Sequence, residues 1–288
     1  MRNKILCIVS FCVCISFGGC EEIKDIIPDR LTPEEIVEGL KAALNKGSEM
    51  ASVHAFGSAL PDFAGGGDGF LNNKHIPDIR IPLPESISPM MSAINQVPPA
   101  VWPVLKTFSS DYDIPAKFIE LERVINIAAS VAAKGAFNAF VPVIRDMNIS
   151  DGLQLLKSEN NTAATEYMFT EAGTALNSTF KDVIDIVLGD QVKVIDQFWT
   201  PLVSTYNKIQ GPDVAGNTLV KIALAAIGED ASLLSFGPAV EPNLDDYIAT
   251  KAIDGLQRLV AREETLIRSN PGNYAEEIIR RVFGHKDD

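Results

Sequence analysis

The run VINIAASVAAKGAFNAFVPVI, residues Val124–Ile144, is apolar on almost every side when it is drawn as a helix. Its polar side chains recur every fourth residue and form one narrow stripe: Asn126, Ser130, Lys134 and Asn138. A helix with this pattern is usually surrounded by other helices over most of its circumference. The run therefore predicts a buried central helix, within a longer helical segment at about residues 115–147.

The same run is a poor candidate for a membrane span. Lys134, Gly135 and Pro142 interrupt it, and Arg145 and Asp146 follow it directly. We therefore expect the central helix to belong to a soluble bundle.

Helical periodicity, capping residues and breaks predict further helices before and after it. The expected helices span residues 32–54, 86–97, 150–157, 162–188, 191–209, 214–227, 244–269 and 273–283. Ser150, Asn161 and Asn243 are the expected caps, Pro201 an expected kink, and Trp102-Pro103 an expected break. Since no alternating strand pattern occurs, the expected fold class is all-α, a single multi-helix bundle.

One long segment, at about residues 60–84, does not fit a helix. Glycines cluster at residues 65–69, and the prolines between residues 76 and 84 favour extended backbone. Apolar residues in this segment predict that it nevertheless packs against the bundle: Phe70, Leu71, Ile79, Ile81 and Leu83. A connection of this length in a compact domain is usually functional or disordered.

The first residues of the chain resemble an export signal. Arg2 and Lys4 precede an apolar run that ends at Phe17-Gly18-Gly19-Cys20, as in a secretory signal peptide. The end of the run also resembles the bacterial lipobox, with Phe17 in place of the usual Leu. We predict a lipoprotein signal peptide at residues 1–19, lipidation of Cys20, and a tether at residues 20–31.

Cys20 would then be the membrane contact, because two or more acyl chains give stable anchoring. Thr32-Pro33-Glu34-Glu35 forms a capping box that starts the first helix. We expect one domain over residues 32–284 and a short tail at residues 285–288. An ordinary signal peptide with a coincidental cysteine is the alternative interpretation.

Charge and residue usage exclude several kinds of site. The formal charge of −13 becomes −15 once residues 1–19 are removed, and the scattered basic residues provide no surface for nucleic acid. All four cysteines precede residue 21, which excludes disulfides and thiolate chemistry from the body of the protein. His54, His75 and His285 are far apart in the sequence. We therefore predict no metal site, no histidine-based site and no cofactor.

Several short pieces of the sequence together resemble one bacterial family. They are Asp68–Asn72, Arg80–Glu85, Ile149–Gly152, Thr162–Tyr167, Asp245–Tyr247, Thr250–Leu256, Glu263-Glu264, Ile267-Arg268, Asn270-Pro271 and Val282–Gly284. In this order, over roughly residues 34–284, the chain is similar to the domain-of-unknown-function family 4197. The resemblance implies an exported, helical, mostly lipid-anchored protein with no established activity.

The central helix departs from the pattern of that family. Where the family has Asn-Arg-Ala-Ala-Glu, this chain has Asn126-Ile127-Ala128-Ala129-Ser130. The resemblance therefore carries over no function that rests on that Arg and Glu.

Glu263 is the acidic residue that most needs an explanation, because it lies near the middle of the apolar arc of helix 244–269. A buried carboxylate has to be paired or neutralised. Arg80, Arg123 and Lys134 are the candidate cations, and we favour Arg80, whose guanidinium can bind a carboxylate bidentately. The predicted buried polar and ion-pair cluster comprises Arg80, Glu263, Lys134 and Asn126.

The polar residues of two helices have competing interpretations. The stripe that contains Asn126 is either the solvent edge of the central helix, which we favour, or an internal polar seam. Glu264 and Arg268 are four residues apart and are expected to form a surface pair.

No sequence motif of a known catalytic class is present, so an enzyme is not favoured. The favoured hypothesis is a lipid-anchored envelope protein that binds another envelope protein or acts as a scaffold. An alternative is a carrier of an apolar, lipid-like ligand, which needs a cavity of several hundred Å³. A hydrolase that uses Glu263, or Asp245 with Asp246, is the last alternative.

Overall fold

The computed structural model describes residues 31–56, 69–71, 73, 75–184, 199–210, 215–229 and 244–284. These residues form a bundle of α-helices joined by short 3₁₀ turns, in the order α1 (Pro33–Phe56), η1 (Pro77–Ile79), η2 (Glu85–Ile87), α2 (Ser88–Asn95), α3 (Val101–Lys106), η3 (Ser110–Tyr112), α4 (Ile114–Asp146), α5 (Ile149–Lys157), α6 (Ala163–Ile184), α7 (Thr200–Gln210), α8 (Ala215–Ala226), α9 (Leu244–Ser269), η6 (Pro271–Asn273) and α10 (Glu277–Gly284). No β-strand occurs in this described part of the chain, and the predicted all-α fold class is confirmed.

The first helix begins as the capping residues predict. The N–H of Thr32 donates to Glu35 Oε2 at 2.8 Å, and the N–H of Glu35 donates to Thr32 Oγ1 at 3.2 Å. This reciprocal pair satisfies two amides at the start of α1, where no intrahelical acceptor exists.

Helix α4 is the central element of the bundle. It matches the predicted helix to within one residue at each end and packs against α1, α6 and α9. Alanines at its contacts are fully buried, and their small side chains let the neighbouring helices approach closely: Ala128, Ala129, Ala132, Ala133 and Ala136. The predicted central helix is therefore confirmed.

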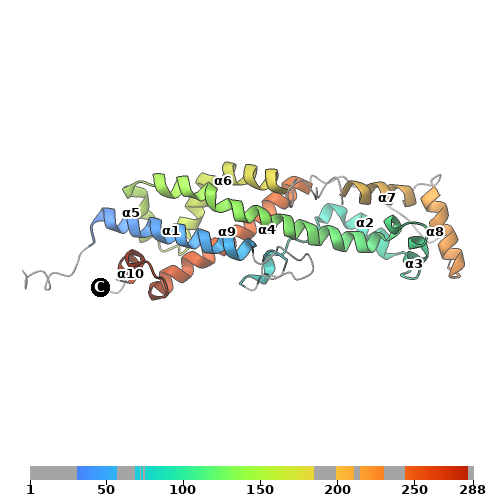
Figure 1. The fold of residues 1–288 in the computed structure, drawn as a ribbon, viewed down its shortest axis with the longest axis horizontal. Helices are drawn as coiled ribbons and strands as arrows, with labels where there is room; N and C mark the ends of the chain where they lie inside the picture. The colour runs from blue at the N-terminus through green and yellow to red at the C-terminus, as the bar shows by residue number, and fades with distance from the viewer. Residues whose placement is uncertain are drawn as a thin grey trace, which may run out of the picture.

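The molecule is elongated along α4 (Figure 1). Helices α1, α5, α6, α9 and α10 lie around the C-terminal half of α4, and α2, α3, α7 and α8 lie toward its N-terminal end. The start of α1 is therefore at one end of the molecule, and α8 is at the opposite end.

Among the described helices, α4 is long and apolar enough to cross a membrane, judged by length and composition alone. Half of its most apolar 18-residue window is buried inside the protein. A buried core helix of a helical bundle passes the same test.

At two positions the structure differs from what the local sequence signals predict. Residues Val101–Lys106 form helix α3 through the predicted break, because Pro103 lies in its first turn, where the missing N–H removes no bond. Pro201 is the second residue of α7, and the residues before Trp199, on which the expected kink depends, lie outside the described residues. Asn148, not Ser150, caps α5 by accepting the N–H of Asp151 at 2.9 Å.

Residues 69–71, 73 and 75–84, which we call the strap, pass between α1, α4 and α9. They include the turn η1 and an extended run from Arg80 to Pro84. Phe70, Ile79 and Ile81 are buried, which confirms that the irregular segment packs. The glycines at residues 65–67 and the cap Asn243 lie outside the described residues.

Candidate functional site

The polar stripe of α4 is divided between the interior and the surface. Asn126 is 0% exposed and Ser130 1% exposed, whereas Lys134 and Asn138 face solvent. The favoured prediction of a solvent edge is therefore wrong for Asn126 and Ser130, because the strap covers them. For these two residues the alternative, an internal polar seam, is the observed arrangement.

The side chain of Asn126 binds the backbone of the strap. The N–H of Ile81 donates to Asn126 Oδ1, and Asn126 Nδ2 donates to the Ile81 carbonyl, both at 2.8 Å. A side-chain amide offers one acceptor and two donors, so it pairs with an extended residue as a neighbouring strand would. The second donor of Asn126 bonds the carbonyl of Glu122 at 2.8 Å.

Ser130 holds the start of the strap. Its Oγ donates to the Asn126 carbonyl at 2.8 Å and accepts the N–H of Phe70 at 2.9 Å. Gly69 has φ +52°, and a Cβ there would lie 2.8 Å from Ser130 Oγ, so this close approach requires glycine. Phe70 then packs on α9 in the space that Gly255 leaves open.

The predicted Arg80–Glu263 ion pair is wrong. The side chain of Arg80 is 52% exposed, and its Nε donates to Glu122 Oε1 at 2.8 Å. Arg80 stands next to the buried Ile81 in an extended segment, where successive side chains point to opposite sides. Inward-facing Ile81 therefore directs Arg80 outward.

The other members of the predicted cluster are also separated from one another. Lys134 is exposed, and its Nζ lies 4.9 Å from the centroid of the Phe56 ring on α1. Asn126 contacts the strap, as described above. Of the four predicted residues, Glu263 is the one that lies buried in a cluster of ionisable groups.

Glu263 is 1% exposed, as its place on the apolar arc of α9 predicts. Its Oε1 lies 2.5 Å from Nη1 of the adjacent Arg262 and 3.5 Å from Nδ1 of His54 on α1. The His54 ring stacks on His75 of the strap, with ring centroids 3.9 Å apart. Glu263, Arg262, His54 and His75, which we call the His–Glu cluster, therefore join α1, the strap and α9.

Burial dominates the electrostatics of this cluster. Loss of solvation raises the pKa of the Glu263 carboxyl, and the charges of Arg262 and His75 oppose that rise. Loss of solvation also raises the pKa of Tyr274, and the nearby Glu263 carboxylate adds to the effect. A carboxyl with a raised pKa beside two imidazoles is a proton-binding arrangement.

Sequence reasoning excluded a histidine-based site because the histidines are far apart in the chain. The structure brings His54 and His75 together from separate segments, and no regular period links those segments. The buried position of Glu263 was visible in the sequence, whereas the two imidazoles beside it were not.

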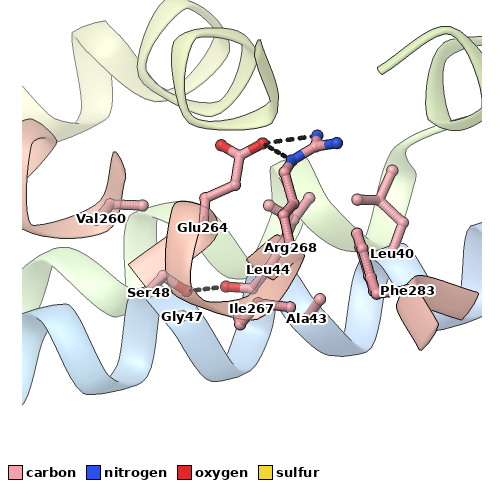
Figure 2. A pocket seen from close by; sticks show the side chains of 10 residues that line it. All are labelled: Leu40, Ala43, Leu44, Gly47, Ser48, Val260, Glu264, Ile267, Arg268 and Phe283. Atoms are coloured by element: carbon pink, nitrogen blue, oxygen red, sulfur yellow. Dashed lines mark hydrogen bonds and ion pairs between the residues drawn. The ribbon is translucent and has the colours of Figure 1, made fainter. Parts of the chain in front are cut away.

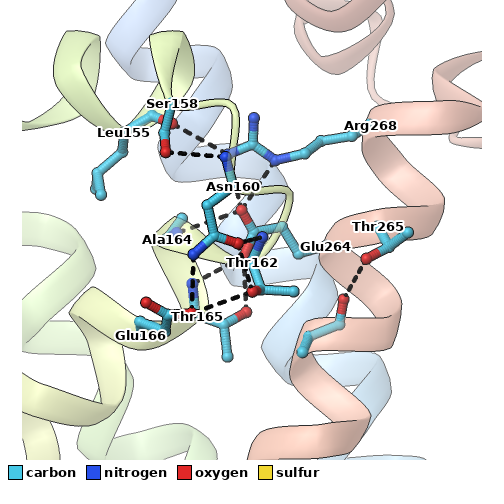
Figure 3. A network of polar contacts seen from close by, with 11 residues as sticks. Leu155, Ser158, Asn160, Thr162, Ala164, Thr165, Glu166, Glu264, Thr265 and Arg268 are labelled. Carbon is cyan, nitrogen blue, oxygen red and sulfur yellow. Dashed lines mark hydrogen bonds and ion pairs between the residues drawn. The ribbon is translucent and has the colours of Figure 1, made fainter.

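A second acid on α9, Glu264, forms a polar staple between helices (Figure 3). It accepts from the N–H of Ala164 at 3.3 Å and from the N–H and Oγ1 of Thr165 at 2.8 and 2.7 Å. Its carboxylate thus caps the start of α6, where the helix dipole favours negative charge.

Arg268 completes this staple. Its Nε and Nη2 donate to Glu264 Oε1 at 2.9 and 2.7 Å, and Nη2 also donates to the carbonyl of Leu155 near the end of α5 at 3.2 Å. Glu264 and Arg268 are each only 6% exposed. The predicted surface pair is therefore a buried pair that ties α5 and α6 to α9.

A small cavity lies below this pair, between α1, α9 and α10 (Figure 2). Apolar side chains from Leu40, Leu44, Ile267 and Phe283 line most of it. The centre of a water molecule can move within about 10 Å³ of this cavity, so the cavity has room for roughly one water. This volume is far below the several hundred Å³ that a lipid-like ligand needs.

The remaining acids and possible metal ligands give no further site. Asp246 forms an ion pair with Lys181 of α6, and the side chain of Asp245 lies outside the described residues. Within the described parts of the chain, no three His, Cys, Asp or Glu side chains are grouped to hold a metal ion. At the His–Glu cluster, the Arg262 guanidinium already occupies Glu263 Oε1.

Comparison with known proteins decides the family. The sequence model of the family described as "Protein of unknown function (DUF4197)" matches residues 30–284. The chain belongs to this family. Comparisons with curated proteins and with solved structures found no match.

In this DUF4197 protein, several of the pieces of sequence that carry the resemblance lie at contacts between elements. Gly69-Phe70 and Arg80–Glu85 belong to the strap, and the N–H of Thr165 donates to the Glu264 carboxylate at the start of α6. Glu263, Glu264 and Arg268 are buried charged residues of α9. These pieces therefore take part in the polar contacts that join the strap, α6 and α9 to their neighbours.

Proposed function

We propose that the protein is a lipid-anchored envelope protein that acts by binding a partner protein, not by catalysis. The single observation that carries the proposal is the run Phe17-Gly18-Gly19-Cys20 after a basic and then apolar start. Such a start fits an export signal whose cysteine receives acyl chains.

The shape of the protein is consistent with this proposal. Helix α1 begins at Pro33, close to Cys20 in sequence, at one end of the elongated molecule (Figure 1). A tether over residues 20–31 spans at most about 40 Å when it is fully extended. Anchoring at Cys20 would keep the α1 end near the membrane and hold the α3–α8 end away from it.

Labelling of Cys20 tests the anchor. Cells that express the protein are fed an alkyne fatty acid, and the protein is purified and assayed for the label. The wild type should carry label and should begin at Cys20 after processing, whereas Cys20→Ala should carry none. An unlabelled wild-type protein in the soluble fraction would contradict the proposal.

Photo-crosslinking tests the partner. Ile119 on α4 and Ile222 on α8 are exposed apolar residues toward the far end, and they offer sites for a photoreactive side chain. We expect both positions to crosslink the same envelope protein in intact cells. Ile149, which starts α5 at the other end, is the matched control. Recovery of only uncrosslinked protein from Ile119 and Ile222 would refute a partner at this end.

The small cavity and the contacts of Glu263 count against the two other functions. The cavity beside Glu264 is too small for a lipid-like ligand. Glu263, the candidate hydrolytic acid, is buried and bonded to Arg262.

A further inference from the structure

The contact between His54 and His75 joins the end of α1 to the strap. The ring centroids are 3.9 Å apart and the ring planes meet at 28°, so the rings are stacked. The His54 side chain is 21% exposed, which leaves the pair within reach of protons from solvent.

Asn73 holds the two histidines in this arrangement. Its Nδ2 donates to the carbonyl of His54 at 3.1 Å, and its Oδ1 accepts the N–H groups of His75 and Ile76 at 3.0 and 2.8 Å. Asn73 is buried, and its side chain therefore ties the turn that carries His75 to the helix end that carries His54. The His75 turn cannot move away from the end of α1 unless these backbone hydrogen bonds break or rearrange.

The charges around the stack come from every element that packs against it. On α9 are the Glu263 carboxylate and Arg262. Other charged or titratable groups of the surrounding elements are Lys46 and Glu49 on α1, Asp78 of η1 with Arg258 of α9, Lys134 on α4, and Tyr274 and Glu276 before α10. With neutral imidazoles, Glu263 and Arg262 balance, so each added proton leaves the His–Glu cluster more positive.

We propose that His54 and His75 form a proton-operated latch on the strap. The pair accepts one proton beside Glu263. A second proton places two positive rings in contact and opens the His75 turn away from α1, while Asn126 keeps its hold on Ile81.

Burial of Glu263 strengthens this response. Because its pKa is raised, the carboxyl gives up its negative charge at a higher pH than an ordinary glutamate does. This loss of negative charge beside the imidazoles adds to the effect of the protons that the imidazoles themselves gain.

The first test is an NMR titration of the histidine rings in the full chain. The protein has three histidines, and His285, outside the described residues, is the internal reference. His54 and His75 should each titrate in two coupled steps. In Glu263→Gln the first step should move to lower pH. Independent single-step titration of His54 and His75 in the wild type would overturn the proposal.

The second test is amide hydrogen exchange, corrected for the intrinsic effect of pH on exchange. After this correction, the His75 and Ile76 amides of the wild type should exchange at least about fivefold faster at about pH 5 than at about pH 8. Two unit charges about 4 Å apart produce this factor even in bulk water. The Ile81 amide, held by Asn126, should stay protected.

Three variants separate the latch from general acid unfolding. His54→Phe and His75→Phe keep a flat ring but bind no proton, so each should keep the two amides protected in acid. His285→Phe should behave as the wild type does. The proposal fails if wild-type protection does not change with pH, or if it is lost equally in both Phe variants.

Discussion

Asn126 shows how one side chain can position an irregular segment. Its amide bonds both backbone groups of Ile81 in the buried interface between α4 and the strap. Replacement of this residue leaves two backbone groups unsatisfied where water does not reach, and an unsatisfied buried group costs more than a typical hydrogen bond contributes.

Asn126→Leu should therefore lower the free energy of unfolding by about 2–6 kcal/mol, because each unsatisfied buried group costs about 1–3 kcal/mol. Urea denaturation measures this change. Asn138→Leu, on the same stripe but in solvent, is the control and should stay within about 0.5 kcal/mol of the wild type. Equal effects of the two variants would contradict the role given to Asn126.

Glu263 predicts a specific dependence of stability on pH. Its folded-state pKa is raised from the ordinary value of 4.5, so the folded protein holds this proton more tightly than the unfolded chain does. The protonated Glu263 therefore contributes fully to the free energy of unfolding below about pH 4.5, and this contribution is lost as the pH rises through the raised pKa.

Glu263→Gln has no proton to lose, so its stability relative to the wild type should increase as the pH rises from about 4.5 through the raised pKa. Thermal or urea unfolding over a pH series tests this. Glu229→Gln, at an exposed site, should follow the wild type at every pH. A constant difference between Glu263→Gln and the wild type would show that burial of Glu263 does not control its proton affinity.

At the scale of helices, the Glu264–Arg268 pair is a buried polar connection between α5, α6 and α9. The two partners are not equivalent. Glu264 has three donors on α6 besides Arg268, whereas the guanidinium bonds one carbonyl, that of Leu155, besides Glu264. Loss of Arg268 would therefore leave Glu264 with three hydrogen-bond donors, whereas loss of Glu264 would leave Arg268 with one acceptor.

Glu264→Gln should cost more than Arg268→Met. The first leaves a buried cation without a counter-charge, at about 3–5 kcal/mol. The second leaves a carboxylate that the start of α6 still stabilises. Unfolding free energies of both variants and of the double variant test the order. If Arg268→Met proved the more damaging variant, the capping role of Glu264 would be wrong.

The elements themselves were largely predictable. The bounds of α9 match the predicted residues, and the Thr32–Glu35 capping box starts α1 as expected, because caps and periodicity are local signals. The Arg80 partner was not predictable: periodicity shows which face of α9 carries Glu263, but an irregular segment has no period that orients its side chains. The His54–His75 contact depends on the path of the strap, which no local signal encodes.

At the scale of the molecule, the family match and the described helices both begin near residue 30. Half of the most apolar window of α4 is buried inside the bundle. We therefore expect the described helices to fold without a lipid phase.

A chain that lacks residues 1–29 should accordingly remain soluble without detergent, be strongly helical, and unfold cooperatively on heating. Circular dichroism and sedimentation of the purified protein test this. Cys20→Ala in the full chain is the companion sample, because it keeps the apolar start and removes only the acylation site. Aggregation of the shortened protein that detergent reverses would instead indicate that α4 needs a membrane.

The length of α4 gives the protein a lever arm. Its 33 residues extend about 50 Å, so a tilt of about 5° at one end displaces the other by about 4 Å. Pro142 has no N–H to donate to the carbonyl of Asn138, so one rung of the helical ladder is missing near the α1 end. A pivot at that rung would turn a small rearrangement beside α1 into a displacement at α8 larger than the length of a hydrogen bond.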